Sequence, residues 1–128
     1  MTLLTLGDVF RKRLRKNAER FYMTNQRLVL TTVSSQEEAR KLANALVERR
    51  LAACVNILPK IDSIYRWKDK IEKSQEFLLL IKTAESAVAK LRDAIQELHS
   101  YEVPEFIVLR IEDGSEAYLK WIDESIKS

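Results

Sequence analysis

The sequence contains little glycine, cysteine or histidine, and each shortage excludes a class of site. Among its 128 residues are two Gly, one Cys and one His. Loops that cradle phosphates need several glycines close together, because only glycine lets backbone N–H groups approach a phosphate so closely. Gly7 and Gly114 are too far apart to form such a loop. One Cys and one His also exclude an intrachain disulfide and a Cys/His zinc finger within one chain.

Catalysis by a nucleophile and an imidazole base would have to use His99, the one histidine. No pairing of a nucleophile with a base, and no pair of carboxylates, can be placed on neighbouring positions from the sequence. We therefore expect a protein that is not an enzyme.

Long apolar runs are also missing. The longest spans 77–81, whereas a membrane-spanning helix needs roughly 18 apolar residues. With 46% apolar residues, the chain is instead predicted to form one compact globular domain.

The positive charge is concentrated at the start of the chain. Residues 1–22 contain six basic and two acidic side chains, a net charge of +4, which leaves −1 of the total of +3 for the other 106 residues. Apolar residues recur there at spacings of three and four: Leu3, Leu6, Phe10 and Leu14. This leader is predicted to form an amphipathic helix with one basic side. It is compatible with an organellar transit peptide, with a helix on an anionic membrane surface, and with sequence upstream of a start at Met23.

The pattern of 23–128 predicts one domain with the order β-α-β-β-α-β and a final helix. Strands are expected over 27–33, 53–67, 71–83 and 106–111. Helices are expected after Ser34 and Ser35, after Thr83 as the capping residue, and after Gly114. The order is that of an α+β ferredoxin-like sandwich, with two helices on one face of the sheet. Residues 77–81 are apolar at every position, so the other face also needs cover, and we expect oligomers.

RNA-recognition modules share this order of elements. Their central strands carry glycines and several aromatic residues, whereas 76–83 holds one aromatic residue and no glycine. Because the domain is also nearly neutral, we expect no nucleic-acid partner.

His99, Glu102 and Glu105 form a His-x-x-Glu-x-x-Glu motif where a helix is expected to end. An imidazole with nearby carboxylates can hold Cu(II) or Zn(II). The alternative is a histidine that interacts with the free carbonyls at the helix C-terminus.

Two further groups of residues are considered as candidate sites. Cys54 lies among small apolar residues with no basic residue beside it in the sequence, so we expect a buried structural thiol. Tyr65, Arg66 and Trp67 precede a hairpin tip expected at 68–70, where they could line a ligand slot or anchor a subunit interface.

Several segments resemble the CutA divalent-cation tolerance family, and the likeness extends from Arg27 to Asp123. The segments that carry it read LAACVN at 51–56, SIYRW at 63–67, KIE at 70–72, LIKT at 80–83, HSYEVPE at 99–105 and YLKW at 118–121. The resemblance implies a homotrimer of ferredoxin-like subunits, similar in architecture to PII signalling proteins, with the sheets facing inward. It also implies a relation to copper and other divalent metals, without an enzymatic reaction.

In some family members a Cys at the end of the first strand and adjacent histidines after the second helix are the metal ligands. Those positions are Thr31, Leu98 and His99 here, so His99 alone is retained. Members also often have Gly in the hairpin tip and Pro after the His, where this chain has Asp69 and Ser100. A metal site would then be weak or would borrow ligands from a neighbouring subunit.

We therefore expect a cytoplasmic homotrimer that responds to metal ions, with His99, Glu102 and Glu105 as metal ligands. The expected cofactor is at most a divalent ion, copper or zinc, and no membrane contact is expected for the core domain. A genuine leader would instead direct the chain to an organelle or a membrane surface. One alternative is a PII-like sensor that binds a small anionic ligand between subunits, with Trp67, Lys82 and Tyr101 in the cleft. A second is a stable trimeric interaction scaffold.

Overall fold

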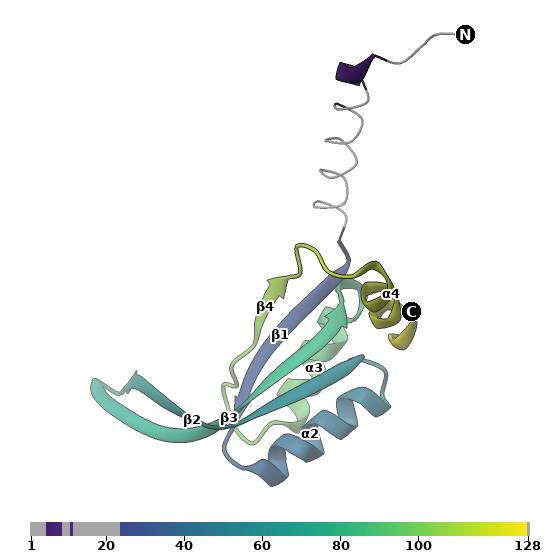
Figure 1. The fold of residues 1–128 in the computed structure, drawn as a ribbon. Coiled ribbons are helices and arrows are strands. Elements are labelled where there is room, and N and C mark those ends of the chain that lie inside the picture. Colours follow the sequence, from purple (N-terminus) through teal and green to yellow (C-terminus); the bar gives the residue numbers. More distant parts are fainter. Residues whose placement is uncertain (1–4, 9–10, 12–23, 128) are drawn as a thin grey trace.

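The computed structural model describes residues 5–8, 11 and 24–127 of the chain. Four antiparallel strands form one sheet in the order β2-β3-β1-β4 (Figure 1). Along the chain the elements are β1 (Gln26–Val33), α2 (Gln36–Glu48), β2 (Cys54–Trp67), β3 (Lys70–Ala84), the short 3-10 helix η1 (Glu85–Ala87), α3 (Val88–Leu98), β4 (Ile107–Arg110) and α4 (Glu116–Ser125). This order and pairing confirm the predicted ferredoxin-like α+β sandwich with an added C-terminal helix.

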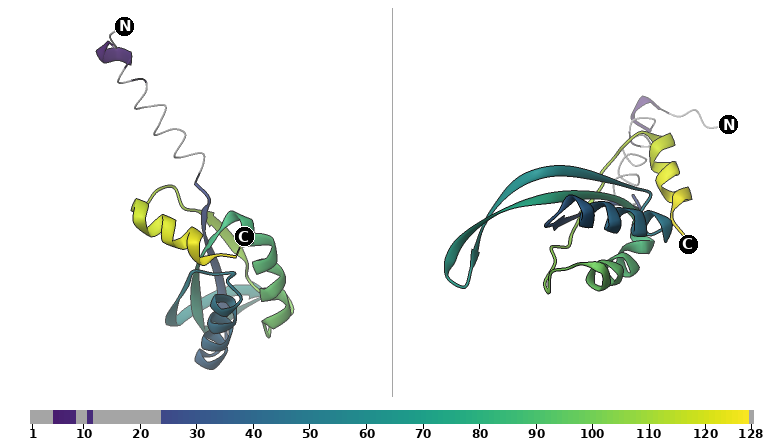
Figure 2. Two further views of the ribbon diagram at one scale, coloured as in Figure 1. Left: turned by 90° about the vertical axis from the view of Figure 1, so that its right-hand side faces the viewer. Right: turned by 90° about the horizontal axis from the view of Figure 1, so that it is seen from below.

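Helices α2 and α3 cover one face of the sheet, as the view from below in Figure 2 shows. The core between them is built from alternate strand residues and from the apolar stripes of both helices. Its fully buried members are Val29, Val33, Ala39, Leu46, Leu79, Ile81, Leu91 and Ile95.

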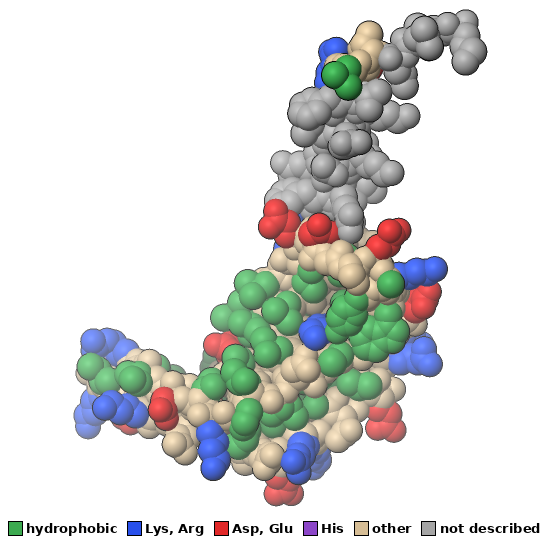
Figure 3. Space-filling model, in the orientation of Figure 1, with side chains coloured by type: hydrophobic (Ala, Val, Ile, Leu, Met, Phe, Trp, Pro, Cys, Tyr) green, Lys and Arg blue, Asp and Glu red, His purple; other side chains and the backbone are tan. Residues whose placement is uncertain are grey.

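The opposite face of the sheet carries no helix over most of its area, and we call it the open face. Successive strand residues point to opposite faces, so the neighbours of the core positions form it. They include Leu28, Leu30, Leu58, Leu78, Leu80, Ile107 and Leu109, which pair with one another across the strands. Figure 3 shows apolar side chains gathered over this face.

Strands β2 and β3 continue past the body of the domain as a two-stranded arm (Figures 1 and 2). Their register shifts between Leu58 and Ile61, where Lys60 has φ 53°. Pro59 has no N–H to donate to the ladder, which accounts for an irregularity at this point. The arm ends at Lys68 and Asp69, whose φ angles of 50° and 64° are those of a two-residue hairpin turn, as predicted.

The helix starts agree with the sequence in one case and differ in another. Ser35 caps α2, because its hydroxyl accepts the Glu38 N–H at 3.1 Å. The prediction that Thr83 caps the next helix is wrong. Thr83 is fully buried at the end of β3, where its hydroxyl donates to the Leu51 carbonyl at 2.7 Å, and α3 begins only after η1.

The leader lies largely outside the described residues. Residues 6–8 and 11 are assigned as helical, and Leu6 is 87% exposed. The rest of the predicted helix, and Met23, where the domain is expected to begin, fall on residues that are not described. Within the described part of the chain, no helix combines the length and the apolar character needed to cross a bilayer.

Candidate functional site

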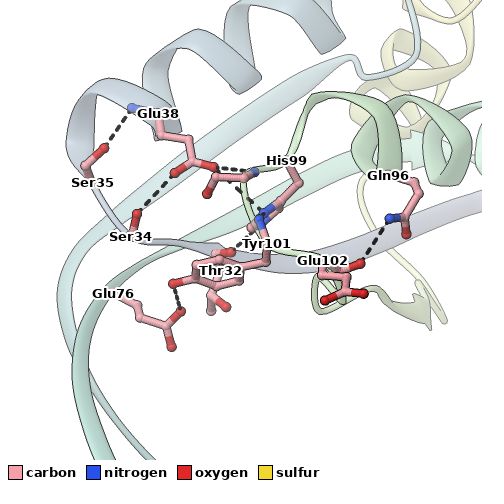
Figure 4. A network of polar contacts seen from close by, with 10 residues as sticks. Thr32, Ser34, Ser35, Glu38, Glu76, Gln96, His99, Tyr101 and Glu102 are labelled. Atoms are coloured by element: carbon pink, nitrogen blue, oxygen red, sulfur yellow. Dashed lines mark hydrogen bonds and ion pairs between the residues drawn. The ribbon is translucent and has the colours of Figure 1, made fainter.

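His99 lies at the C-terminal end of α3 and is the centre of a polar network (Figure 4). Its imidazole is fully buried. Nδ1 accepts the backbone N–H of Tyr101 at 3.0 Å. A backbone N–H can only donate, so Nε2 carries the ring proton and donates to the Thr32 carbonyl at 2.7 Å. Both ring nitrogens are therefore engaged within the chain.

Glu38, from the first turn of α2, closes the other side of this network. One carboxylate oxygen accepts the Ser100 N–H at 3.0 Å, and the other accepts the Ser34 hydroxyl at 3.2 Å. Burial alone would raise the pKa of Glu38, but the hydrogen bonds from Ser100 and Ser34 outweigh it and lower this pKa. The Glu38 carboxylate thus fixes the loop that follows α3.

Tyr101 joins the same loop to β3. Its hydroxyl donates to a carboxylate oxygen of Glu76 at 2.9 Å, and Glu76 is 7% exposed. Burial, this hydrogen bond and the Glu76 charge together raise the pKa of Tyr101 to about 12. The Tyr101 ring also lies 4.7 Å from the His99 ring, measured between centroids.

The three expected metal ligands are not gathered into one site within the chain. Glu102 and Glu105 are exposed, whereas the His99 imidazole is fully buried with both nitrogens engaged. Among residues 5–8, 11 and 24–127, no group of three or more His, Cys, Asp and Glu side chains is arranged to hold a metal ion. A single subunit in this conformation therefore does not fit a divalent ion at these residues.

The expected ligand-cleft residues are also separated. Trp67 lies at the tip of the arm and pairs with Lys70, whereas Lys82 pairs with Cys54 near the other end of the same two strands. Tyr101 is engaged with Glu76 between these ends. A cleft that contains all three residues would have to combine different subunits.

Lys82 anchors a second cluster, between β3 and α4. Its ammonium donates to the Tyr118 hydroxyl at 3.1 Å, and this hydrogen bond is the main reason that the pKa of Lys82 is raised. The Tyr118 ring stacks on Trp121 at 5.4 Å between centroids.

The surroundings of Cys54 differ from those expected. The sequence places no basic residue beside it, but Lys82 lies directly opposite on β3, and the two interact electrostatically. Cys54 is also half-buried rather than buried. The expected full burial of Cys54 is therefore wrong, and the sequence argument for an inert thiol leaves out Lys82, because this basic neighbour comes from another strand.

Sequence reasoning missed two members of the network around His99. Glu38 lies in the first turn of the helix expected after Ser35, and nothing in the sequence connects it with Ser100, which is 62 residues away. Glu76 precedes an apolar run without any motif of its own, so neither its burial nor its contact with Tyr101 could be anticipated.

The part of the chain that matches a known family is nearly the same as the part that forms the sheet and helices described above. A family model described as "CutA1 divalent ion tolerance protein" matches residues 27–125. The divalent-cation tolerance protein CutA of Thermus thermophilus is 50% identical over 100 residues, which cover 78% of this chain and 97% of that protein. The chloroplastic CutA protein of Arabidopsis thaliana is 44% identical over 101 residues, which cover 79% of this chain but 56% of the relative.

A solved structure supports the same relation. The divalent cation tolerance protein Cut A1 from Thermus thermophilus superimposes with a TM-score of 0.78 at 49% identity, covering 80% of this chain and 99% of that chain. The family model's match over residues 27–125 includes nearly all of the sheet, both covering helices and α4, and it leaves out the leader.

Proposed function

This chain belongs to the CutA1 divalent ion tolerance protein family, and from that membership we propose that it acts in divalent-cation tolerance as a homotrimer that binds copper or another divalent ion. The proposed role involves no enzymatic reaction of its own. The proposed location is the cytoplasm; cell fractionation tests it, and recovery of the protein in an organelle would contradict it.

The apolar open face is the observation that carries the assembly. Ile107 and Leu109 of β4 are 44% and 43% exposed, and Leu58 of β2 is 48% exposed. Soluble monomers rarely expose a contiguous apolar patch of this kind. Copies of the same sheet can cover it, since an apolar face is complementary to itself.

The metal site is proposed at the loop that follows α3. Glu102 and Glu105 are exposed there and can offer carboxylate oxygens to an ion. His99 can join only by releasing the Tyr101 N–H from Nδ1. Because the described residues of one subunit offer no third free ligand at this place, the proposal includes a ligand from the neighbouring subunit.

Calorimetric titration of the full chain with Cu(II) and with Zn(II) tests this site. We expect the affinity to fall at least tenfold in the Glu102→Gln/Glu105→Gln variant and in His99→Ala. Glu112→Gln removes an exposed acid from another loop and serves as the matched control. Equal affinity in all variants would remove the site assignment, and the absence of saturable binding by the wild type would remove metal binding itself.

A sensor of a small anionic ligand is the second candidate, and it is favoured by the position of Lys82. Its ammonium lies beside the open face and is held in the charged form by Tyr118. A subunit cleft could add Trp67 from another copy. We expect a nucleotide or a carboxylic acid metabolite to raise the melting temperature of the wild type but not that of Lys82→Met; equal shifts would reject this site.

A further inference from the structure

Glu76 is a buried carboxylate that neither proposed function uses. It is 7% exposed, and the partner that the structure gives it is the Tyr101 hydroxyl at 2.9 Å. Within the described part of the chain, no Lys, Arg or His forms an ion pair with Glu76. Removal of a carboxylate from water is costly unless an opposite charge or several hydrogen bonds compensate for it.

The surroundings of Glu76 add negative charge rather than positive charge. Glu38 acts on the same tyrosine, since the charges of both carboxylates contribute to the raised pKa of Tyr101. The nearest imidazole, that of His99, accepts a hydrogen bond at Nδ1 and donates one at Nε2, which is the neutral form. The position is therefore one at which a cation would be stabilised.

The geometry leaves part of the carboxylate available. In Figure 4 one oxygen of Glu76 meets the Tyr101 hydroxyl, and the other turns away from the labelled residues. Glu76 alternates with Phe77 and Leu79 of the core, so it lies on the open face, opposite Ile61 at the point where β2 and β3 change register. Tyr65, 44% exposed, lies on the same face of β2 as Ile61.

We propose that the Glu76 carboxylate, through the oxygen that the Tyr101 hydroxyl does not occupy, binds a cationic nitrogen group, an ammonium or a guanidinium, that arrives over the open face. Such a group forms short, charge-assisted hydrogen bonds to one carboxylate. Aromatic rings such as that of Tyr65 can add a cation–π contribution. A divalent metal ion needs more ligands than this position offers, because no described group of three metal-ligating side chains exists.

This inference changes the ligand class expected at Tyr101. The sequence suggested that Tyr101 helps to hold an anion, but its hydroxyl already donates to a carboxylate, which would repel an anion. The cationic group has two possible sources: a Lys or Arg of a second copy of the chain, or a free small amine. The first source uses the proposed assembly, and the second is independent of it.

The test compares Glu76→Gln with Glu72→Gln in the full chain. Glutamine keeps a carbonyl that accepts from Tyr101 and removes only the charge, while Glu72 is an exposed acid on the same strand. Binding of ethylguanidinium and of ethylammonium is measured by calorimetry, with acetate as the anionic counterpart. Assembly is measured by native mass spectrometry over a dilution series, and circular dichroism confirms folding.

If the cationic group is a Lys or Arg of a second copy, Glu76→Gln is expected to raise the dissociation constant of the assembly at least tenfold. Glu72→Gln is then expected to leave this constant unchanged. A free amine as the ligand predicts unchanged assembly and at least tenfold weaker ethylguanidinium binding in Glu76→Gln. The proposal is overturned if the two variants behave alike in both measurements, or if acetate binds in a Glu76-dependent manner. Should Glu76→Gln not fold, Tyr101→Phe is the second variant. It leaves the carboxylate without a donor and is expected to strengthen cation binding or assembly, and weaker binding there would also overturn the proposal.

Discussion

At the scale of single residues, two buried threonines differ in whether the side-chain hydroxyl has a hydrogen-bond partner, and this difference affects the free energy of unfolding. Thr31 and Thr83 are both fully buried in neighbouring strands. The Thr83 hydroxyl donates to the Leu51 carbonyl, whereas no described group pairs with the Thr31 hydroxyl. A buried polar group without a partner is a net cost to the folded state.

We expect Thr31→Val to stabilise the protein by about 1 kcal/mol, because valine keeps the shape and removes the unpaired hydroxyl. Thr83→Val is the matched control and should destabilise the protein by about 1–3 kcal/mol, since it leaves the Leu51 carbonyl unpaired. Chemical denaturation of both variants measures these differences. Equal losses of stability would show that the Thr31 hydroxyl has a partner after all.

Tyr101 provides a pH-dependent signal at the same scale. Its pKa is raised from 10.0 to about 12 by burial and by the Glu76 carboxylate. The neutral phenol is favoured in the folded state, so this stabilisation is complete below pH 10 and is lost as the pH rises toward 12.

The phenolate absorption of Tyr101 is the difference between the wild type and Tyr101→Phe at high pH. We expect this phenolate absorption to appear only near pH 12. In a Glu76→Gln background the midpoint of this difference should move to lower pH. A midpoint that does not depend on residue 76 would show that burial alone causes the shift.

At the scale of the elements, the sequence was informative wherever a periodic pattern decides the structure. The helix start after Ser35 and the hairpin tip follow from local rules, and the structure confirms them. Contacts between segments that are distant in the sequence could not be predicted from such local patterns. The hydrogen bond of Thr83 to Leu51, the pairing of Cys54 with Lys82 and the burial of Glu76 all depend on strand register.

The candidate site was therefore predicted only in part. His99 was identified from its motif, but the engagement of both its nitrogens depends on Thr32 and Tyr101. The approach of β1 to the loop after α3 is a consequence of tertiary folding, and no local spacing of residues encodes it.

The hairpin tip allows a prediction at the element scale. Lys68 and Asp69 both have positive φ angles, which glycine adopts at lower cost than other residues. We expect Asp69→Gly to stabilise the protein by about 0.5 kcal/mol. Asp62→Gly, within β2, should instead destabilise it by about 0.5–1 kcal/mol, because glycine there only adds freedom to the unfolded chain. Denaturant titration distinguishes the two, and a loss of stability in Asp69→Gly would contradict the turn assignment.

At the scale of the whole molecule, the two faces of the sheet differ in how far they are covered. One is closed by α2 and α3, and the other exposes the apolar residues of β4 and β2 (Figure 3). A lysine introduced into an interface on the open face would bury an unpaired charge.

If the proposed homotrimer forms through the open face, Leu109→Lys is expected to lower the mass from three chain masses to one in size-exclusion chromatography with light scattering. Val47→Lys, on α2, changes a side chain of similar exposure, 42% against 43%, and should leave the mass unchanged. If both variants keep the wild-type mass, the open face is not the contact between copies.

The arm formed by β2 and β3 has a consequence for local stability. Beyond Ile61 and Glu76 the two strands pair only with each other among the residues that the structure describes. An isolated two-stranded ribbon is marginally stable in water. The amide hydrogens of this arm should therefore exchange with solvent through local opening, much faster than those of β1, unless another copy packs against it. If another copy packs against the arm, the exchange rates of its amide hydrogens would rise on dilution. The exchange rates of the arm therefore indicate whether the chain is alone or assembled.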